Sequence, residues 1–283
     1  MSNLTTTFHQ INLHKSKLAN FELFKQIEPL HNFAALTQEP HTWKGKITGL
    51  PRGLRSHLVG LKPRSCIIWP KKLNITPITE FCSGDVVSCI WESNSVLHTN
   101  VMLISVYWDI QLDEVPTQLV SCLNYCKSHK IPYLCSMDSN AHSSLWGCPS
   151  DNPRGKTLEE FIIRSGSDIL NVGTQPTFSN YRYSTIIDIT LSDPSLSPSL
   201  SNWRIHNTPS LSDHAAIRVD LNLTPPLPYP YVFGKLRTGF SSNLSFTAFP
   251  PYPPYGMKPP LKLSVTSFMT PSMKPWTRPA PSN

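Results

Sequence analysis

Short apolar runs alternate with polar stretches over the first 220 residues of the chain. Runs rich in Val, Ile, Leu and Phe predict strands, and apolar residues that recur every three or four positions predict helices. The predicted strands are 8–13, 33–36, 66–69, 86–91, 101–107, 131–137, 168–170, 177–178, 185–191 and 215–221. The predicted helices are 15–27, about 114–128 and 156–164. Helices interspersed among short strands are typical of α/β proteins, so we expect a mixed α/β sandwich in one domain.

This pattern stops after residue 222. Half of the 28 prolines fall within the last 60 residues, in runs such as the one at 250–254. Such a stretch lacks the apolar periodicity that a core requires. We therefore predict a folded domain over 1–222 and a disordered, Pro-rich basic tail over 223–283.

The formal net charge of +7 invites comparison with nucleic-acid-binding proteins. Six of the 25 Lys and Arg residues lie after residue 220, however, where the sequence has no Asp or Glu. The first 220 residues hold the other 19 basic residues and all 18 acidic ones. On this count the excess charge belongs to the tail, and it does not indicate that the folded part binds DNA.

The seven cysteines are an odd number without the paired spacing of zinc ligands, and we expect free thiols in a reducing compartment. No secretory signal is recognisable at the N-terminus, and no stretch has the length and apolarity of a membrane span. We expect an intracellular protein without membrane contact, nuclear if it acts on chromosomal DNA. The sequence does not determine the oligomeric state.

Polar side chains of the kinds found in catalytic and metal sites follow or interrupt several of the apolar runs. Asp138 and Asn140 come after 131–137, Asp188 interrupts 185–191, and Asp213 and His214 precede 215–221. Strand ends that open into loops are where α/β proteins gather reactive side chains. Three carboxylates, an amide and an imidazole in such places indicate a divalent metal and a phosphate ester.

Glu39 and Asn12 extend this set upstream. Glu39 follows a predicted strand, and its carboxylate suits Mg²⁺, which takes one or two protein carboxylates and keeps several waters. A solvated Glu before the turn-forming Pro40 is the alternative. Asn12 ends the first predicted strand, where its amide would orient a metal-bound water or a phosphate oxygen, or would only cap a turn or helix.

Three further positions have a chemical and a structural interpretation. Asp138 and Asn140 alternate at a strand end, so we expect both to point to one face, although a D-x-N triplet is common by chance. Tyr107 ends a strand, where its hydroxyl would bind a phosphate oxygen or anchor a loop.

Asp188 lies between isoleucines, and a carboxylate there is costly to bury unless it is paired. We expect an imidazole as its partner, the alternative being a strand face that exposes Asp188. His214 is suited to act as acid or base near neutral pH and, when charged, to stabilise a transition state.

Taken in order, these blocks resemble the endonuclease/exonuclease/phosphatase superfamily, and most closely the apurinic-type endonuclease domain of non-LTR (LINE-like) retrotransposons. The resemblance covers about residues 8–221 and rests on five segments: QINLHKSKLA, LTQEPHTWKGKITGL, MDSNAHSSLWGCPSDNPRGKTLEEFI, DILNVGTQPTF and IIDITL. It implies a DNase I-like fold, a four-layered α/β sandwich of two mixed β-sheets flanked by helices. It further implies that Glu39 binds Mg²⁺, or Mn²⁺ in its place, with Asn12 and Asp213 supporting the metal and its water.

The same resemblance implies the catalytic groups. Asp138 and Asn140 match a D-x-N pair at the scissile phosphate, Tyr107 matches a phosphate-positioning tyrosine, and Asp188 matches the acid that orients the catalytic His214. The implied reaction is metal-dependent hydrolysis of a phosphodiester in DNA, leaving a 3′-hydroxyl that primes reverse transcription. The acid and base roles of Asp138 and His214 stay open.

The chain departs from this group in three ways. Ala215 and Ala216 follow the Asp-His pair where the group usually has a bulkier residue or Pro, and the loop 179–184, which in the group contacts the DNA groove, is short. No reverse transcriptase follows, so we expect a retrotransposon-derived fragment. The alternatives are a catalytically inactive remnant that at most binds partners through its tail, and a phosphomonoesterase of the same superfamily.

Overall fold

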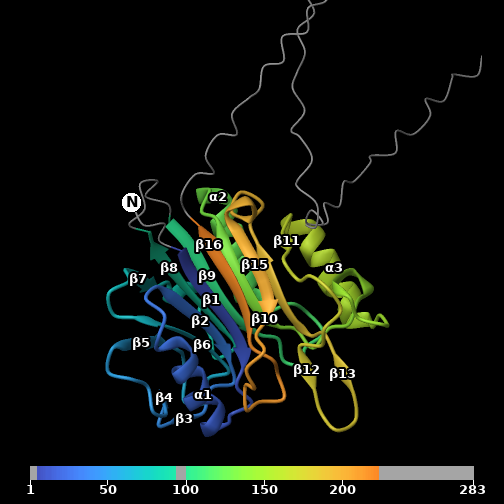
Figure 1. Ribbon diagram of the computed structural model, residues 1–283. Helices are drawn as coiled ribbons and strands as arrows, with labels where there is room; N and C mark the ends of the chain where they lie inside the picture. Colours follow the sequence, from blue (N-terminus) through green and yellow to red (C-terminus); the bar gives the residue numbers. More distant parts are fainter. Residues whose placement is uncertain (1–4, 94–99, 223–283) are drawn as a thin grey trace, which may run out of the picture.

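Two six-stranded sheets lie face to face in the computed structural model, which describes residues 5–93 and 100–222 (Figure 1). The first sheet has the order β15 (Leu200–Ile205), β16 (Ile217–Asn222), β1 (Thr5–Asn12), β2 (Phe33–Gln38), β6 (Ser65–Pro70), β5 (Leu54–His57). The second has the order β11 (Asp168–Ile169), β14 (Asp188–Ser192), β10 (Tyr133–Asp138), β9 (Asn100–Tyr107), β8 (Val86–Glu92), β7 (Ile75–Pro77). Each sheet is mixed, because β1 and β2 are parallel, as are β9 and β10, while the remaining pairs are antiparallel.

Apolar side chains fill the space between the sheets and the space outside each of them. The inter-sheet core includes Phe8, Leu36, Ile67, Leu103 and Leu134. Helix α1 (Lys17–Ile27) packs on the outer face of the first sheet, and α2 (Thr117–His129) and α3 (Pro153–Ser165) pack on the outer face of the second. The order helix, sheet, sheet, helices confirms the predicted four-layered α/β sandwich.

Most predicted elements are present, with differences at irregular positions. The short strands β3 (Thr42–Trp43), β4 (Lys46–Ile47), β5, β7 and β15 were not expected. The strand predicted over 185–191 is divided into β13 (Ser184–Thr185) and β14, and β13 pairs instead with β12 (Phe178–Ser179). Tertiary contacts cause the division: Thr177 Oγ1 accepts the backbone N–H groups of Ile187 and Asp188, while Ser139 binds the carbonyl of Ile187.

Two buried glutamines join the sheets through polar bonds inside the apolar core. Gln10 Nε2 donates to the carbonyls of Met137 and Ile189, each at 3.3 Å, and Gln10 Oε1 accepts from Thr190. Gln38 Nε2 donates to Ser105 Oγ at 3.1 Å and to the carbonyl of Ser136 at 3.3 Å. Bonds of this kind cost free energy if they are left unmade, so they hold the ends of β1 and β2 opposite the ends of β9, β10 and β14.

Two further features concern the cysteines and the helices. All seven cysteines are free, six of them buried. Within residues 5–93 and 100–222 no helix has the length and apolarity to span a membrane. The predicted disordered tail lies outside the described residues and stays a prediction.

The start of α3 is held against the loop that follows β10. Asn152 caps the helix, since its Oδ1 accepts from the backbone N–H of Gly155 at 2.6 Å and from that of His142 at 3.1 Å. A Cβ at Gly155 would lie 1.8 Å from the carbonyl oxygen of His142. Only glycine allows this approach, which explains the glycine of the NPRG block.

Gly155→Ala should therefore lower the free energy of unfolding by about 1–3 kcal/mol, the usual cost of overpacking. Urea unfolding measures this, with Gly53→Ala as the matched control. A Cβ at Gly53 has nothing within 4 Å, and we expect a change within about 0.5 kcal/mol there. Equal effects of the two substitutions would contradict the close approach.

Candidate active site

The predicted site residues converge where β1, β2, β9 and β10 end. Asn12 ends β1, Glu39 follows β2, Tyr107 ends β9 and Asp138 ends β10. Asp188 starts β14 directly across from Asp138, while Asp213 and His214 lie in the loop before β16. The carboxyl ends of neighbouring parallel strands lie at one edge of a sheet. Because two such edges face each other here, residues that are far apart in sequence come together.

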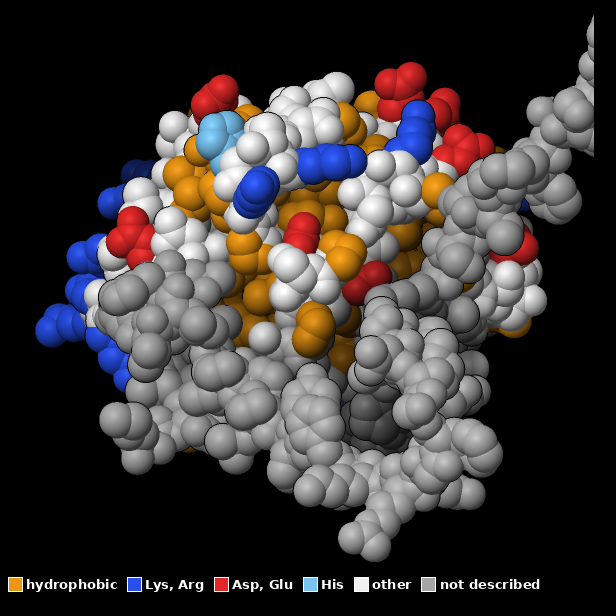
Figure 2. Space-filling view, turned by 90° about the horizontal axis from the view of Figure 1, so that it is seen from above, with side chains coloured by type: hydrophobic (Ala, Val, Ile, Leu, Met, Phe, Trp, Pro, Cys, Tyr) orange, Lys and Arg blue, Asp and Glu red, His pale blue; other side chains and the backbone are white. Residues whose placement is uncertain are grey.

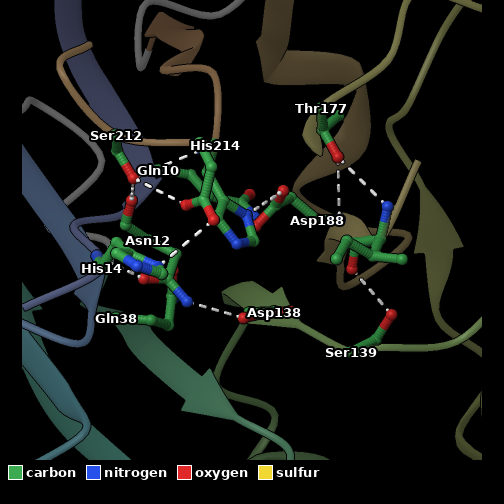
Figure 3. A network of polar contacts seen from close by, with 12 residues as sticks. Gln10, Asn12, His14, Gln38, Asp138, Ser139, Thr177, Asp188, Ser212 and His214 are labelled. Carbon is green, nitrogen blue, oxygen red and sulfur yellow. Dashed lines mark hydrogen bonds and ion pairs between the residues drawn. The ribbon is translucent and has the colours of Figure 1, made fainter. Parts of the chain in front are cut away.

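A buried ion pair joins Asp188 to His214. Asp188 Oδ2 lies 2.8 Å from Nδ1 of His214, and the two side chains are 1% and 5% exposed (Figure 3). The ring of Phe178 meets the imidazole edge-on at 4.9 Å between centroids. Burial alone would lower the pKa of His214, but the charges of Asp188, Asp138 and Asp213 and the Asp188 hydrogen bond raise it to about 9. The imidazole is therefore a cation at neutral pH.

A second buried contact links Asp138 to Asn12. Asn12 Nδ2 donates to Asp138 Oδ2 at 2.7 Å, while Asn12 Oδ1 accepts the backbone N–H of His14 at 2.8 Å (Figure 3). Burial and the nearby charge of Asp188 raise the pKa of Asp138 to about 7, against the opposing effects of His214 and the Asn12 hydrogen bond. Asp138 is thus poised to exchange a proton near neutral pH.

The loop before β16 is tied to the end of β1. Ser212 Oγ donates to the carbonyl of Asn12 at 2.8 Å and accepts the backbone N–H of His214 at 3.3 Å. One hydroxyl therefore connects the strand that carries Asn12 with the loop that carries His214, and Figure 3 shows the imidazole between Asn12 and Asp188.

Asp138, Asp188 and His214 lie close enough together to hold one cation, but His214 can serve as a ligand only without the proton that it carries at neutral pH. Each offers one ligand atom, and the three atoms lie within 4.8 Å of one another. Oδ1 of Asp138 and Oδ1 of Asp188 are buried without a hydrogen-bond partner among the described residues. Two unpaired carboxylate oxygens in one place require a proton, a cation or a ligand donor.

The two carboxylates predicted to bind the metal, Glu39 and Asp213, already have basic side chains beside them. Lys15 Nζ lies 2.7 Å from Glu39 Oε1, and His14 Nδ1 lies 3.2 Å from Asp213 Oδ2. His14, Lys15 and Glu39 have positive φ angles of 48°, 51° and 45°, a backbone conformation that non-glycine residues seldom adopt. The backbone thus bends sharply just after β1 and just after β2. The structure leaves the metal-binding roles of Glu39, Asn12 and Asp213 as predictions.

Tyr107 lies beside this cluster as a half-buried hydroxyl. Burial, Glu39 and Asp138 raise its pKa to about 12, so the hydroxyl keeps its proton at neutral pH and remains a donor. The guanidinium of Arg64 lies 4.8 Å from the centre of its ring. Asp85 and Asp109 hold Arg64 in turn, which fixes the face that Tyr107 packs against.

The expected alternation of Asp138 and Asn140 along one strand is wrong. β10 ends at Asp138, and Asn140 has a φ of 50° in the loop beyond it. Asn140 Nδ2 instead donates to the carbonyl of Trp108 at 3.3 Å. The alternation rule fails because it holds only for extended backbone. The predicted catalytic role of Asn140 is not tested by this contact.

Sequence reasoning missed the residue that organises the loops around the site. Arg154 donates to the carbonyls of Ser139, Trp108, Asp109 and Leu112 at 2.6–2.9 Å. Its guanidinium also lies 3.6 Å from the centre of the Trp108 ring. The only signal was its place in the NPRG block, which the resemblance used without assigning a role.

Comparisons with known proteins bear on the fold that carries these residues. Residues 101–218, from β9 into β16, match a family model described as endonuclease-reverse transcriptase. The endonuclease domain of TRAS1, a telomere-specific non-LTR retrotransposon, has a similar structure with a TM-score of 0.66 and 23% identity over 78% of this chain and 100% of that one. The AP endonuclease LMAP from Leishmania major gives a TM-score of 0.59 and 12% identity over 77% and 88%.

A DNA-bound structure is also similar. The 3′ phosphatase NExo from Neisseria, bound to a product DNA hairpin, gives a TM-score of 0.55 and 11% identity over 76% of this chain and 99% of that one. At these identities the likeness establishes the fold, and the DNase I-like prediction is confirmed. A search of curated protein sequences found no match.

Removing the carboxylate of Asp188 should lower the pKa of His214 strongly. In Asp188→Asn the two favourable contributions of Asp188 disappear while the cost of burial stays, so the pKa should fall well below 9. NMR titration of the His214 ring in EDTA measures this. Asp213→Asn, which removes a weaker contribution, should give a smaller downward shift. A pKa near 9 in Asp188→Asn would contradict the ion pair.

The stability of the metal-free chain should fall as the pH rises from 6.5 to 9. The folded chain holds the His214 proton up to a pKa of about 9, against 6.5 as the ordinary value, so its contribution is complete below pH 6.5 and is lost through pH 9. Asp138, with a pKa raised from 3.8 to about 7, acts in the same direction between those values. Urea midpoints in EDTA measure the profile. His214→Gln should flatten its upper part, and an unchanged slope in that variant would refute the assignment.

Proposed function

Since the chain has the fold of the endonuclease/exonuclease/phosphatase superfamily and matches an endonuclease-reverse transcriptase family model, we propose that it is a metal-dependent endonuclease that hydrolyses a phosphodiester in DNA. The observation that carries the proposal is the buried Asp188–His214 ion pair beside the Asp138–Asn12 contact. A charged imidazole and a carboxyl of intermediate pKa lie next to each other there.

These groups suit phosphoryl chemistry. His214, a cation up to pH 9, stabilises negative charge that develops on a phosphate, and Asp188 holds its ring in place. Asp138, with a pKa of about 7, exchanges a proton with the attacking water or the leaving oxygen. Tyr107 offers a neutral hydroxyl donor to a phosphate oxygen. Positioning and charge stabilisation provide most of the rate enhancement in such reactions.

We assign the metal to the Glu39 side of the site. Asp188 is already neutralised by protonated His214, and a divalent cation between them would face that positive charge. Among the described residues Glu39 is paired only with Lys15, whose side chain is 67% exposed and free to move away. Asn12 and Asp213 are linked on this side of the site, because His14 contacts both of them and Ser212 bonds to the carbonyl of Asn12. Oxygen ligands of this kind suit Mg²⁺ or Mn²⁺. The bound metal would supply Lewis-acid stabilisation of the phosphate charge.

The likeness to the TRAS1 endonuclease domain supports a retrotransposon origin for this chain. We propose a retrotransposon-derived nuclease that nicks chromosomal DNA in the nucleus. The Neisseria 3′ phosphatase keeps phosphomonoester hydrolysis as a second candidate, since its fold is also similar. The complete set of acid, amide and imidazole argues against an inactive remnant.

Purified protein should nick supercoiled plasmid in Mg²⁺ and not in EDTA. Asp138→Ala and His214→Ala should each slow nicking by at least about 100-fold, the usual contribution of a general acid or base. The loss of supercoiled plasmid on agarose gels measures the rate, and extension of the nick by a polymerase reports the 3′-hydroxyl. Equal nicking by both variants would reveal a contaminating nuclease and end the proposal. Activity on p-nitrophenyl phosphate without nicking would favour the phosphomonoesterase.

A further inference from the structure

The nearly balanced charge of residues 1–220 hides a strong asymmetry along the chain. Residues 40–79, which we call the basic segment, contain eight Lys and Arg residues and no Asp or Glu. The rest of 1–220 holds eleven basic against eighteen acidic residues. A count over the whole domain averages these two parts. The basic segment therefore carries excess positive charge in addition to the tail.

The basic segment starts at the rim of the candidate active site. Glu39 directly follows β2, and the hairpin of β3 and β4 begins three residues later at Thr42. Seven cations of the segment are exposed and form no ion pair with a described residue: Lys44, Lys46, Arg52, Arg55, Lys62, Lys71 and Lys72. Only Arg64 is neutralised, by Asp85 and Asp109.

Backbone contacts bring these cations together in two groups. Gly45, between Lys44 and Lys46, lies against the carbonyl of Gly60, which brings Lys62 close to the hairpin. At the sheet edge, the N–H of Lys71 donates to the carbonyl of Gly53, which brings the second group together: Arg52, Arg55, Lys71 and Lys72. Figure 2 shows Lys and Arg side chains gathered along the left side of the molecule, the side of β5 and β7 in Figure 1.

The hairpin is fixed in position rather than loosely attached. Asn20, fully buried in α1, donates to the carbonyls of His41 and Thr48 and accepts the N–H of His41. The imidazole of His41 also contacts Thr48 Oγ1 at 2.8 Å. Cations on a preorganised support bind a phosphate backbone with less loss of conformational entropy.

Two large apolar side chains lie exposed among the first group of cations. Trp43 is 71% exposed and Leu61 is 83% exposed, and both adjoin lysines in sequence. An aromatic side chain next to lysines offers stacking to a sugar or base while the ammonium groups contact phosphates. An acidic protein partner would satisfy the cations but does not explain the exposed indole beside a phosphodiesterase site.

We propose that the basic segment is a docking surface for the DNA duplex that flanks the scissile phosphate, with Lys44, Lys46 and Lys62 on backbone phosphates and Trp43 against a sugar or base. This rests on the proposed function only in choosing DNA as the ligand. The duplex extends from the site along the β3–β4 hairpin towards the β5 edge. The cations raise the local concentration of DNA at the site and fix its direction.

The test is binding of a fluorescein-labelled 30-base-pair duplex in EDTA, followed by anisotropy over a range of salt concentrations. The triple variant Lys44→Gln, Lys46→Gln, Lys62→Gln should bind at least tenfold more weakly at low salt. Its slope of log K against log salt should fall by about 2–3, because each lost phosphate contact removes about 0.9. The matched control is Lys127→Gln, Lys130→Gln, Arg164→Gln, three exposed cations on α2, at its C-cap and on α3, which should leave the slope unchanged.

Trp43→Ala supplies a second, independent readout. It should weaken binding without changing the salt slope, since it removes a contact that releases no counterion. Urea midpoints for every variant show whether each is folded. An unchanged slope in the folded triple variant, or an equal loss in the matched control, would overturn the docking surface. Stronger retention on anionic phospholipid vesicles than on the duplex would overturn it as well.

Failure of this proposal is distinguishable from failure of the proposed function. Binding in EDTA requires no catalysis, so a duplex-binding chain that never nicks DNA would reject the nuclease and keep the surface. If the triple variant nicks plasmid at the same rate as the unmodified chain and binds the duplex equally well, the nuclease is kept and the docking surface is rejected.

Discussion

Two carboxylates, Asp138 and Asp188, are buried opposite each other on neighbouring strands. Their negative charges repel each other, and the architecture around them depends on how this repulsion is relieved. His214 neutralises one and Asn12 donates to the other. Both partners come from the first sheet or from the loop leading into it, so the site exists only when the two sheets are packed together. Folding and assembly of the reactive groups are thus one event.

The glutamines in the inter-sheet layer serve the same purpose. Gln10 and Gln38 each lie one or two residues before a site residue, Asn12 and Glu39, and each bonds to the second sheet. An apolar core alone specifies spacing loosely, because one apolar side chain slides past another at little cost. Directional bonds fix the register between sheets, and the reactive side chains inherit that precision.

The sequence predicted the parts of this structure that depend on local periodicity. Strands such as β9 and β10 and the helix α1 follow directly from their apolar patterns, and Asp188 was expected to need an imidazole because its neighbours are isoleucines. Positions governed by tertiary contacts were missed. The left-handed backbone at Asn140, the break before β14 and the carbonyl bonds of Arg154 arise from partners distant in sequence, which no local pattern encodes. A summed charge likewise conceals where the cations lie in space.

The β12–β13 hairpin is joined at its base to the groups around His214. Phe178 bridges to His214 through the backbone, the N–H of Ser179 donates to the carbonyl of Asp213, and Thr177 accepts the N–H of Asp188. Its tip at 180–183 is outside these bonds, apart from the packing of Tyr183 on Phe178. Residues of the tip can therefore be substituted without disturbing the site, while the base, which holds the imidazole and its carboxylate, tolerates little change.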